Sequence, residues 1–185
     1  RFASRQVRNR GTLVGNIANS SPIADIPPLL LVMDAQLILQ RGLNQRTIPL
    51  KEFNLDYKQT ALKTGEFIHS VILPLPLSGQ RVSVEKVSKR AEDDISATCV
   101  AMSVTIEHGT ITQVNIACGG MAAIPKMASE TQSQLLGQPL THELVAQVPL
   151  WLAQDYQPID DMRASAAYRQ QVTANLIQGF LKEAM

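Results

Sequence analysis

Apolar and polar positions alternate through the middle of the chain. Residues 97–106 alternate large apolar with small side chains, which is the two-residue period of a strand that packs one face on a core. Similar patterns cover residues 82–87 and 114–118, and the His-Gly pair within residues 107–110 suits a tight turn. The pattern predicts a three-stranded antiparallel meander.

A different pattern precedes the meander. Residues 26–35 form an apolar run after Asp25, with two prolines where the first turn of a helix tolerates them. We expect a helix that ends near residue 34, with Asp25 as its N-cap. Strand-type patterns follow at 36–40 and 46–50, joined by a turn, and again at 67–73.

Helical periodicity takes over after the meander. Pro125 fits the first position of a helix that Gly137 would end. A second apolar stripe covers residues 144–152, where Pro149 should kink the helix. Residues 168–181 form the clearest amphipathic helix. Its apolar stripe consists of Tyr168, Val172, Leu176 and Phe180, with Ile177 and Leu181.

Strands followed by helices predict an α+β fold for the second half of the chain. The stretch of residues 74–80 contains proline, glycine and serine and is typical of a linker. We place a boundary near Gly79, which gives one module at residues 1–78 and another at 79–185.

Composition and charge narrow the possible partners. The chain of 185 residues has 17 basic and 16 acidic side chains, a net charge of +1, so nothing in its charge favours nucleic acid or an anionic membrane. The longest apolar stretch, residues 29–33, is too short to cross a bilayer, and we expect a cytoplasmic protein. Cys99 and Cys118 lie in strand-like runs and are predicted to be buried thiols. The chain begins at Arg1 without an initiator methionine, which suggests a fragment.

Residues 11–22 carry the most unusual composition. Glycines, hydroxyls and side-chain amides at this density suit a pyrophosphate, because glycine permits close approach and oriented donors stabilise negative charge. The stretch lacks the lysine and spacing of a P-loop and does not match the Rossmann glycine pattern. On composition alone, an ordinary loop is the alternative interpretation.

Residues 86–95 form the only dense charge cluster, with three basic and three acidic side chains. The cluster is either a solvated loop or a set of charges placed beside a redox cofactor, where they would shift its potential. The three histidines, at positions 69, 108 and 142, share no motif, so neither zinc nor hydrolytic chemistry is expected.

Residues 2–25 closely resemble the second FAD-binding motif of the molybdenum hydroxylase flavoproteins. The cluster at 89–95, the Gly-Gly-Met-Ala stretch at 119–122 and residues 163–169 resemble the C-terminal flavoprotein domain of that family, in the expected order. The resemblance covers essentially the whole chain. It implies the second half of a PCMH-type FAD-binding domain, followed by a CO dehydrogenase flavoprotein C-terminal-like domain with a three-stranded antiparallel sheet and C-terminal helices.

Within the family, Glu92-Asp93-Asp94-Ile95 resembles the xanthine dehydrogenase branch. The resemblance implies an electron path from a molybdopterin cofactor through iron-sulfur clusters to FAD and then to NAD+. The iron-sulfur and molybdopterin groups are expected elsewhere, in an N-terminal FAD/iron-sulfur region and a molybdopterin-binding large subunit.

The resemblance also implies roles for individual residues. Arg90 and Asp93 are expected on the loop nearest the flavin ring, as the candidate catalytic residues. The expected FAD contacts are Phe2 near the adenine, Thr12, Gly15, Asn16, Asn19 and Ser21 at the phosphates or ribitol, Asp25 at the ribose or neighbouring groups, and Ile68 and Lys86 beside the flavin.

One position departs from the family motif. The family usually has two glycines before the asparagine, and Val14 replaces the first. A β-branched residue resists a positive φ and keeps a phosphate farther away, so Val14 predicts weaker FAD binding. The family's first FAD loop has no counterpart here. Two alternatives stay open: the flavoprotein of a CO dehydrogenase or aldehyde oxidoreductase, and a non-catalytic interaction module that has lost FAD binding.

Overall fold

The computed structural model describes residues 2–91 and 93–185, so Glu92 of the acidic cluster lies outside the described residues. Its helices are α1 (Arg5–Arg8), α2 (Leu13–Ala18), α3 (Ile26–Val32), the short 3-10 helix η1 (Leu50–Glu52), α4 (Ser129–Leu135), α5 (His142–Ala146), α6 (Val148–Asp155) and α7 (Ala166–Glu183). Its strands are β1 (Gln36–Arg41), β2 (Asn44–Pro49), β3 (Asn54–Asp56), β4 (Gln59–Thr60), β5 (Phe67–Ile72), β6 (Arg81–Val87), β7 (Thr98–Glu107), β8 (Thr110–Gly119) and β9 (Lys126–Met127).

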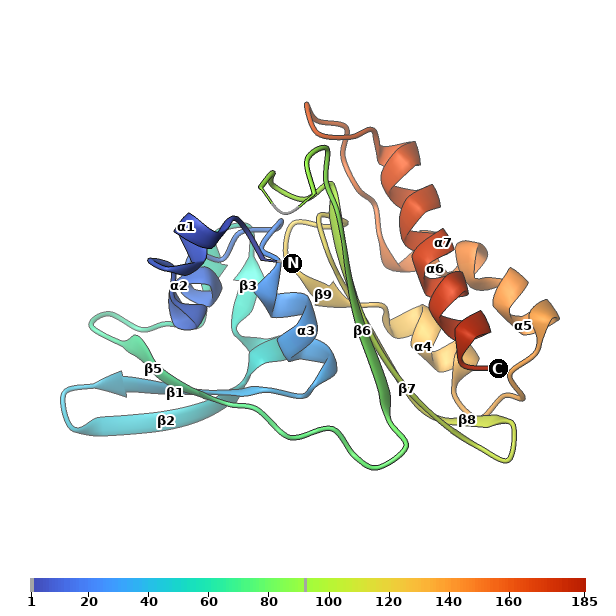
Figure 1. Ribbon diagram of the computed structural model, residues 1–185. Coiled ribbons are helices and arrows are strands. Elements are labelled where there is room, and N and C mark those ends of the chain that lie inside the picture. Colours follow the sequence, from blue (N-terminus) through green and yellow to red (C-terminus); the bar gives the residue numbers. More distant parts are fainter. Residues whose placement is uncertain (1, 92) are drawn as a thin grey trace.

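A central antiparallel sheet, in the order β6-β7-β8-β9, separates two groups of elements. Figure 1 shows α1 to α3 and the small sheets β2-β1-β5 and β3-β4 on one side, and α4 to α7 on the other. The predicted meander is confirmed in β6, β7 and β8. The pattern missed β9, whose two residues pair with Ala117 and Cys118 of β8.

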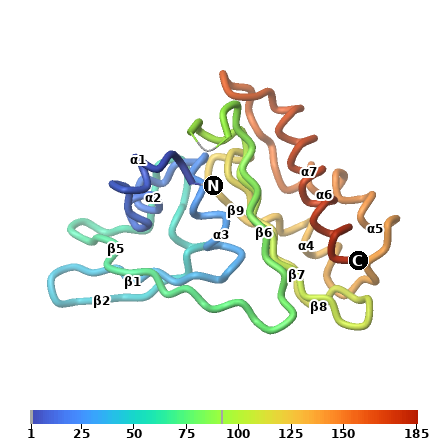
Figure 2. The backbone as a smooth tube through the Cα atoms, viewed as in Figure 1, coloured from blue at the N-terminus to red at the C-terminus, as the bar shows by residue number. Residues whose placement is uncertain are grey.

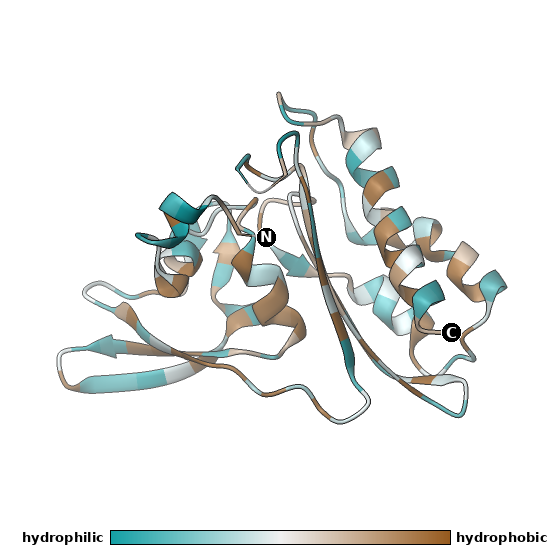
Figure 3. Ribbon diagram, in the orientation of Figure 1, coloured by the Kyte–Doolittle hydropathy of each residue, from teal (hydrophilic) through white to brown (hydrophobic). Residues whose placement is uncertain are grey.

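Both faces of the central sheet are buried, whereas the sequence pattern predicted one buried face. Large side chains of β7, such as Val100 and Met102, pack in a core with α4 to α7. The small residues between them face the N-terminal core, where Ala101 and Ala117 contact the side of α3. Figure 3 shows hydrophobic residues along α3 and on α7. Small side chains let a helix approach a sheet closely, which explains the large-small alternation.

The hairpin predicted before the linker is confirmed. β1 pairs with β2 and β5, and Gly42 takes a φ of +58° at the turn between β1 and β2. Figure 2 shows the chain running from the end of β5 to the start of β6 without a described helix or strand. The boundary near Gly79 stays a prediction. No helix in residues 2–91 and 93–185 is both long and apolar enough to span a membrane.

The helices after the sheet differ in detail from the prediction. Pro125 does not begin a helix: it precedes β9, and α4 starts at Ser129. Gly137, at φ +77°, follows the end of α4 as expected. Pro149 lies in the first turn of α6, so the stripe at 144–152 is two helices rather than one kinked helix.

The long helix α7 is confirmed, and Ile177 and Leu181 of its predicted apolar stripe are buried. Arg169 and Thr173 are buried on the same face, whereas Tyr168 is 50% exposed. The sequence pattern missed Arg169 and Thr173 because an apolar stripe does not identify a buried arginine or threonine.

Candidate functional site

The glycine- and amide-rich stretch contains a short helix rather than only a loop. Thr12 is the N-cap of α2, and its Oγ1 accepts a hydrogen bond from the Gly15 amide at 3.0 Å. A Cβ on Gly15 would lie 2.7 Å from that same Oγ1. Glycine at this position therefore keeps the cap intact and leaves the surface above it open.

Val14 does not carry the strain that the family motif suggested. It lies inside α2, and it is absent from the described residues with positive φ. Its side chain is partly buried against the N-terminal core. The expectation that this backbone needs a glycine-like conformation is wrong, because a β-branched residue adopts helical φ without clash.

Asn16 has an acceptor that the described part of the chain does not satisfy. Its Oδ1 is buried and has no hydrogen-bond partner among the described residues. A buried acceptor without a donor costs about 1–3 kcal/mol, so such an atom calls for a partner from outside the chain. The hydroxyl groups of FAD are donors of the required kind, and the donor and acceptor set of α2 fits that cofactor.

A second hairpin supports the end of α2. Lys58, in the turn between β3 and β4, donates from Nζ to the Asn19 carbonyl at 2.8 Å and to Asn19 Oδ1 at 3.1 Å. The hydroxyl of buried Ser20 donates to Asn54 Oδ1 at 2.9 Å. Sequence patterns gave no sign of Lys58 or Asn54, because both lie far along the chain from the motif they support.

Asp25 occupies the N-cap position of α3, but its side chain does not cap the helix. Instead its carboxylate accepts from Lys86 Nζ at 2.9 Å and from the Ser96 hydroxyl. The Lys86 side chain is only 4% exposed and that of Asp25 is 13% exposed. The structure thus brings together two of the predicted cofactor residues, and Ser96 is a third member that the sequence did not identify.

The remaining predicted contacts lie around this centre. Phe2 is half-buried, and its ring lies next to Gly11. Ile68 is 7% exposed in β5 and packs in the same core as Ile17 of α2. Ser21 lines a pocket of about 540 Å³. Contacts of these three residues with FAD stay predictions.

Arg90 and Asp93 lie on a separate loop. Arg90 donates through Nη2 to Asp94 Oδ1 at 2.7 Å and through its amide to Asp94 Oδ2 at 3.0 Å. The hydrogen bond from the Arg90 side chain is the main cause that lowers the pKa of Asp94. Asp93 is exposed and lines a second pocket, of about 370 Å³, with Lys89 and Met162. Its place beside a flavin stays a prediction.

Other chemistry finds little support in the described residues. Both cysteines are free and buried, as predicted, and burial raises the pKa of each thiol to about 12. No group of three histidine, cysteine or acidic side chains that could hold a metal ion occurs within residues 2–91 and 93–185.

Comparison with known families gives this geometry its context. Residues 84–184 match the CO dehydrogenase flavoprotein C-terminal domain, and residues 1–76 match the FAD binding domain in molybdopterin dehydrogenase. The chain belongs to the molybdenum hydroxylase flavoproteins. The resemblance of the sequence motifs to this family is confirmed, as is the α+β architecture of its FAD-binding and C-terminal domains.

Individual relatives of the flavoprotein differ in activity. Nicotinate hydroxylase of Emericella nidulans is 36% identical over 97% of this chain and 14% of its own length. Xanthine dehydrogenase of Oryza sativa subsp. japonica is 38% identical over 78% of this chain and 11% of its own. The solved carbon monoxide dehydrogenase of Hydrogenophaga pseudoflava, in a form that lacks the Mo-pyranopterin moiety, is 27% identical with a TM-score of 0.90, over 96% of this chain and 62% of that one. The flavoprotein chain therefore spans less than two thirds of each.

A buried ion pair near both pockets completes the site and was not predicted. Arg169 of α7 is 1% exposed and donates through Nη2 to Asp161 Oδ1 at 2.6 Å. Burial raises the pKa of Asp161, but the amides of Arg163 and Ala164 and the Arg169 guanidinium together lower it well below its ordinary value. The segment 163–169 stood out by resemblance, yet nothing in it indicated a pair with Asp161.

Proposed function

We propose that this chain is the FAD-binding electron-transfer part of a xanthine dehydrogenase-type oxidoreductase. In the intact enzyme, electrons from a molybdopterin centre would pass through iron-sulfur clusters to FAD and then to NAD+. The observation that carries the FAD part is the unsatisfied Asn16 Oδ1 on α2, beside the Gly15 position where no side chain covers the Thr12 cap.

The residues that would hold FAD form one continuous region. Thr12, Gly15, Asn16 and Asn19 lie along or next to α2, and Asp25 follows with its carboxylate fixed by Lys86. When bound, FAD supplies the capacity to take up electrons and deliver a hydride. The chain's own residues provide fixed acceptors and donors, and the Lys86 ammonium keeps the Asp25 carboxylate in one orientation.

The pocket of about 540 Å³ supports an anionic acceptor such as NAD+. Its lining includes Ser21, Tyr57, three cationic residues (Lys58, Arg163 and Arg169) and one carboxylate, Asp161. Cations and an aromatic ring at one opening suit a pyrophosphate joined to a flat base. Because Ser21 belongs to the FAD motif, an acceptor in this pocket would lie close to the cofactor.

Relatives of other specificity support a second candidate. The fold likeness to a carbon monoxide dehydrogenase and the match to a nicotinate hydroxylase over nearly the whole chain favour the flavoprotein of a different molybdenum hydroxylase equally well. The sequence of residues 92–95 carries the resemblance that favours the xanthine dehydrogenase branch. The non-catalytic alternative loses its argument from Val14, since that residue is unstrained in α2.

Asn16→Ala tests the FAD assignment, because a residue that only stabilises the fold would not lower FAD retention while leaving the stability of the FAD-free protein unchanged. Removal of a buried unsatisfied acceptor should leave the FAD-free protein as stable as wild type, or more stable by up to about 1–3 kcal/mol. FAD retention should nevertheless fall. Asn175→Ala, at an exposed position of α7 outside the FAD motif, is the matched control and should leave FAD retention unchanged. Normal FAD retention in Asn16→Ala would refute the role of Asn16.

The acceptor is tested separately in the intact enzyme. Stopped-flow mixing of the reduced flavoprotein with NAD+ should oxidise the flavin rapidly. Oxidation by O2 or an artificial acceptor, with no reaction toward NAD+, would favour the second candidate.

A further inference from the structure

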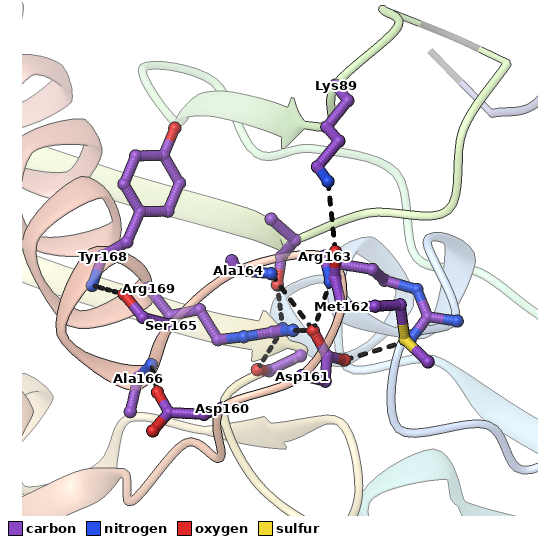
Figure 4. Close-up of polar contacts among 12 residues, drawn as sticks. Lys89, Asp160, Asp161, Met162, Arg163, Ala164, Ser165, Ala166, Tyr168 and Arg169 are labelled. Atoms are coloured by element: carbon purple, nitrogen blue, oxygen red, sulfur yellow. Dashed lines mark hydrogen bonds and ion pairs between the residues drawn. The ribbon is translucent and has the colours of Figure 1, made fainter.

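The loop between α6 and α7 is folded around one carboxylate. Asp161 Oδ1 accepts from the Arg163 amide at 2.8 Å and the Ala164 amide at 3.1 Å, and Oδ2 accepts from Arg163 Nη1 at 3.0 Å. The Asp161 amide in turn donates to the Ala164 carbonyl at 3.1 Å. Figure 4 shows these side chains converging on Asp161. One charge thus fixes the shape of residues 161–164.

Arg169 ties this loop to the central sheet. Its Nη1 donates to the carbonyls of Ala97 and Gly120, the latter at 3.0 Å, while Nη2 holds Asp161. Gly120 has a φ of +82°, and a Cβ there would lie 2.6 Å from the Ala97 carbonyl oxygen and 3.0 Å from Arg169 Nη1. Only glycine fits between the sheet and the guanidinium.

The same contacts reach both candidate regions. The Gly120 amide donates to the Pro22 carbonyl at 2.7 Å, at the end of the FAD motif. On the other side, Lys89 Nζ donates to the Met162 carbonyl at 3.1 Å, which joins the α6–α7 loop to the loop that carries Asp93 (Figure 4). Arg163 lines both the pocket beside Ser21 and the pocket beside Asp93.

We propose that Asp161 and Arg169 are positioning residues that hold the α6–α7 loop and, through the Lys89–Met162 hydrogen bond, the position of Arg90 and Asp93. Arg169 is buried and Asp161 is partly buried. Together they connect the FAD motif to the Asp93 loop through hydrogen bonds from Pro22 to Asp161, then through the peptide bond to Met162 and its hydrogen bond with Lys89. The catalytic consequence rests on the proposed function, in which Arg90 and Asp93 lie on the loop nearest the flavin. The coupling between the two loops does not depend on the proposed function.

The decisive variant is Lys89→Met, which removes the contact between the loops and leaves the buried pair in place. Arg81→Met is the matched control: Arg81 is an exposed cation of β6 that also donates to one backbone carbonyl, that of Glu183 at 2.7 Å. Asp161→Asn is the second variant, since it keeps the acceptor for backbone amides but removes the charge that holds Arg169.

Hydrogen exchange of the intact enzyme, followed on peptides that cover 88–95 and 157–165, measures the coupling without NAD+. We expect exchange at 88–95 to be about fivefold faster in Lys89→Met, the effect of losing one hydrogen bond. Arg81→Met should leave it unchanged. Asp161→Asn should speed exchange in both loops, and if this variant does not fold, Lys89→Met still decides the question.

Activity gives the second readout. Lys89→Met should slow flavin oxidation by NAD+ several-fold at an unchanged thermal midpoint and unchanged FAD content. Equal exchange at 88–95 in Lys89→Met and wild type would overturn the inference, whatever the activity. A wild-type enzyme that does not react with NAD+ would overturn the proposed acceptor and leave the exchange result as a separate test.

Discussion

The ion pair between Asp25 and Lys86 should be one of the costliest polar contacts to break. It joins the start of α3 to β6, and the Lys86 side chain is 4% exposed at 2.9 Å from the carboxylate. Removing one member of a buried pair leaves the other charge poorly solvated, which costs about 3–5 kcal/mol. Lys86→Met should therefore lose a large part of the 5–15 kcal/mol that is typical of the stability of a domain.

A double-mutant cycle separates the pair from the loss of each side chain. Asp25→Asn keeps an acceptor for the Ser96 hydroxyl, and Lys86→Met keeps most of the buried stem. The double variant should be less destabilised than the sum of the two, with a coupling of about 2–3 kcal/mol, near the upper end for residues in contact. Urea unfolding followed by circular dichroism gives each free energy.

The control pair is Arg46 and Glu66, joined at 2.8 Å on the small N-terminal sheet. Arg46 is 33% exposed, so water screens this pair and its coupling should be clearly smaller. A coupling between Asp25 and Lys86 no larger than that of the control pair would refute the view that burial makes the contact strong. The site would then be held by packing alone.

Val14→Gly should lower the free energy of unfolding by about 1 kcal/mol in a thermal assay, because glycine weakens the interior of α2. Tighter FAD retention in this variant, measured by flavin fluorescence, would contradict the reasoning. The Arg46 hydrogen bond lowers the pKa of Glu66 to about 2 from an ordinary 4.5, so this contribution to stability is present above pH 4.5 and is lost as the pH falls through 2. Between pH 4.5 and pH 2, the unfolding midpoint of Glu66→Gln should therefore fall less steeply with decreasing pH than the midpoint of wild type. Cys99 and Cys118, whose pKa values burial raises to about 12, should react with a thiol reagent at pH 8 only after unfolding; fast reaction of the native protein would show that they are accessible.

Elements with a regular repeat of hydrophobic residues could be predicted from the sequence. Elements that are stabilised by caps, single buried side chains or pairing with distant strands could not. The alternation found both β7 and β8, because it covers most of β7 and residues 114–118 of β8. α2 was interpreted as a loop or phosphate cradle, since glycine and asparagine are poor helix formers; the Thr12 cap and the fully buried Ile17 stabilise it. β9 has two residues, which is too short for any period.

The candidate site also contains residues that the sequence could predict and residues that it could not. The stretch from Phe2 to Asp25 could be predicted because it is contiguous and resembles the family's FAD motif, whereas the composition of residues 11–22 alone left an ordinary loop open. Lys58 contacts Asn19 across 39 positions, and Ser96 contacts Asp25 across 71. Such partners become neighbours only when the chain folds, so a motif indicates candidate binding residues but not those that hold them in place.

The central sheet explains why the two halves depend on each other. Ala101 and Ala117 are fully buried against α3, and a Cβ on Gly119 would lie 3.1 Å from the carbonyl oxygen of Ala24, next to Asp25. Larger side chains at these three positions would push the N-terminal segment away from the sheet. Asp25 would then leave Lys86 and Ser96, which lie on and beside that sheet. The geometry of the FAD motif is therefore set by small residues of the following domain as much as by the motif itself.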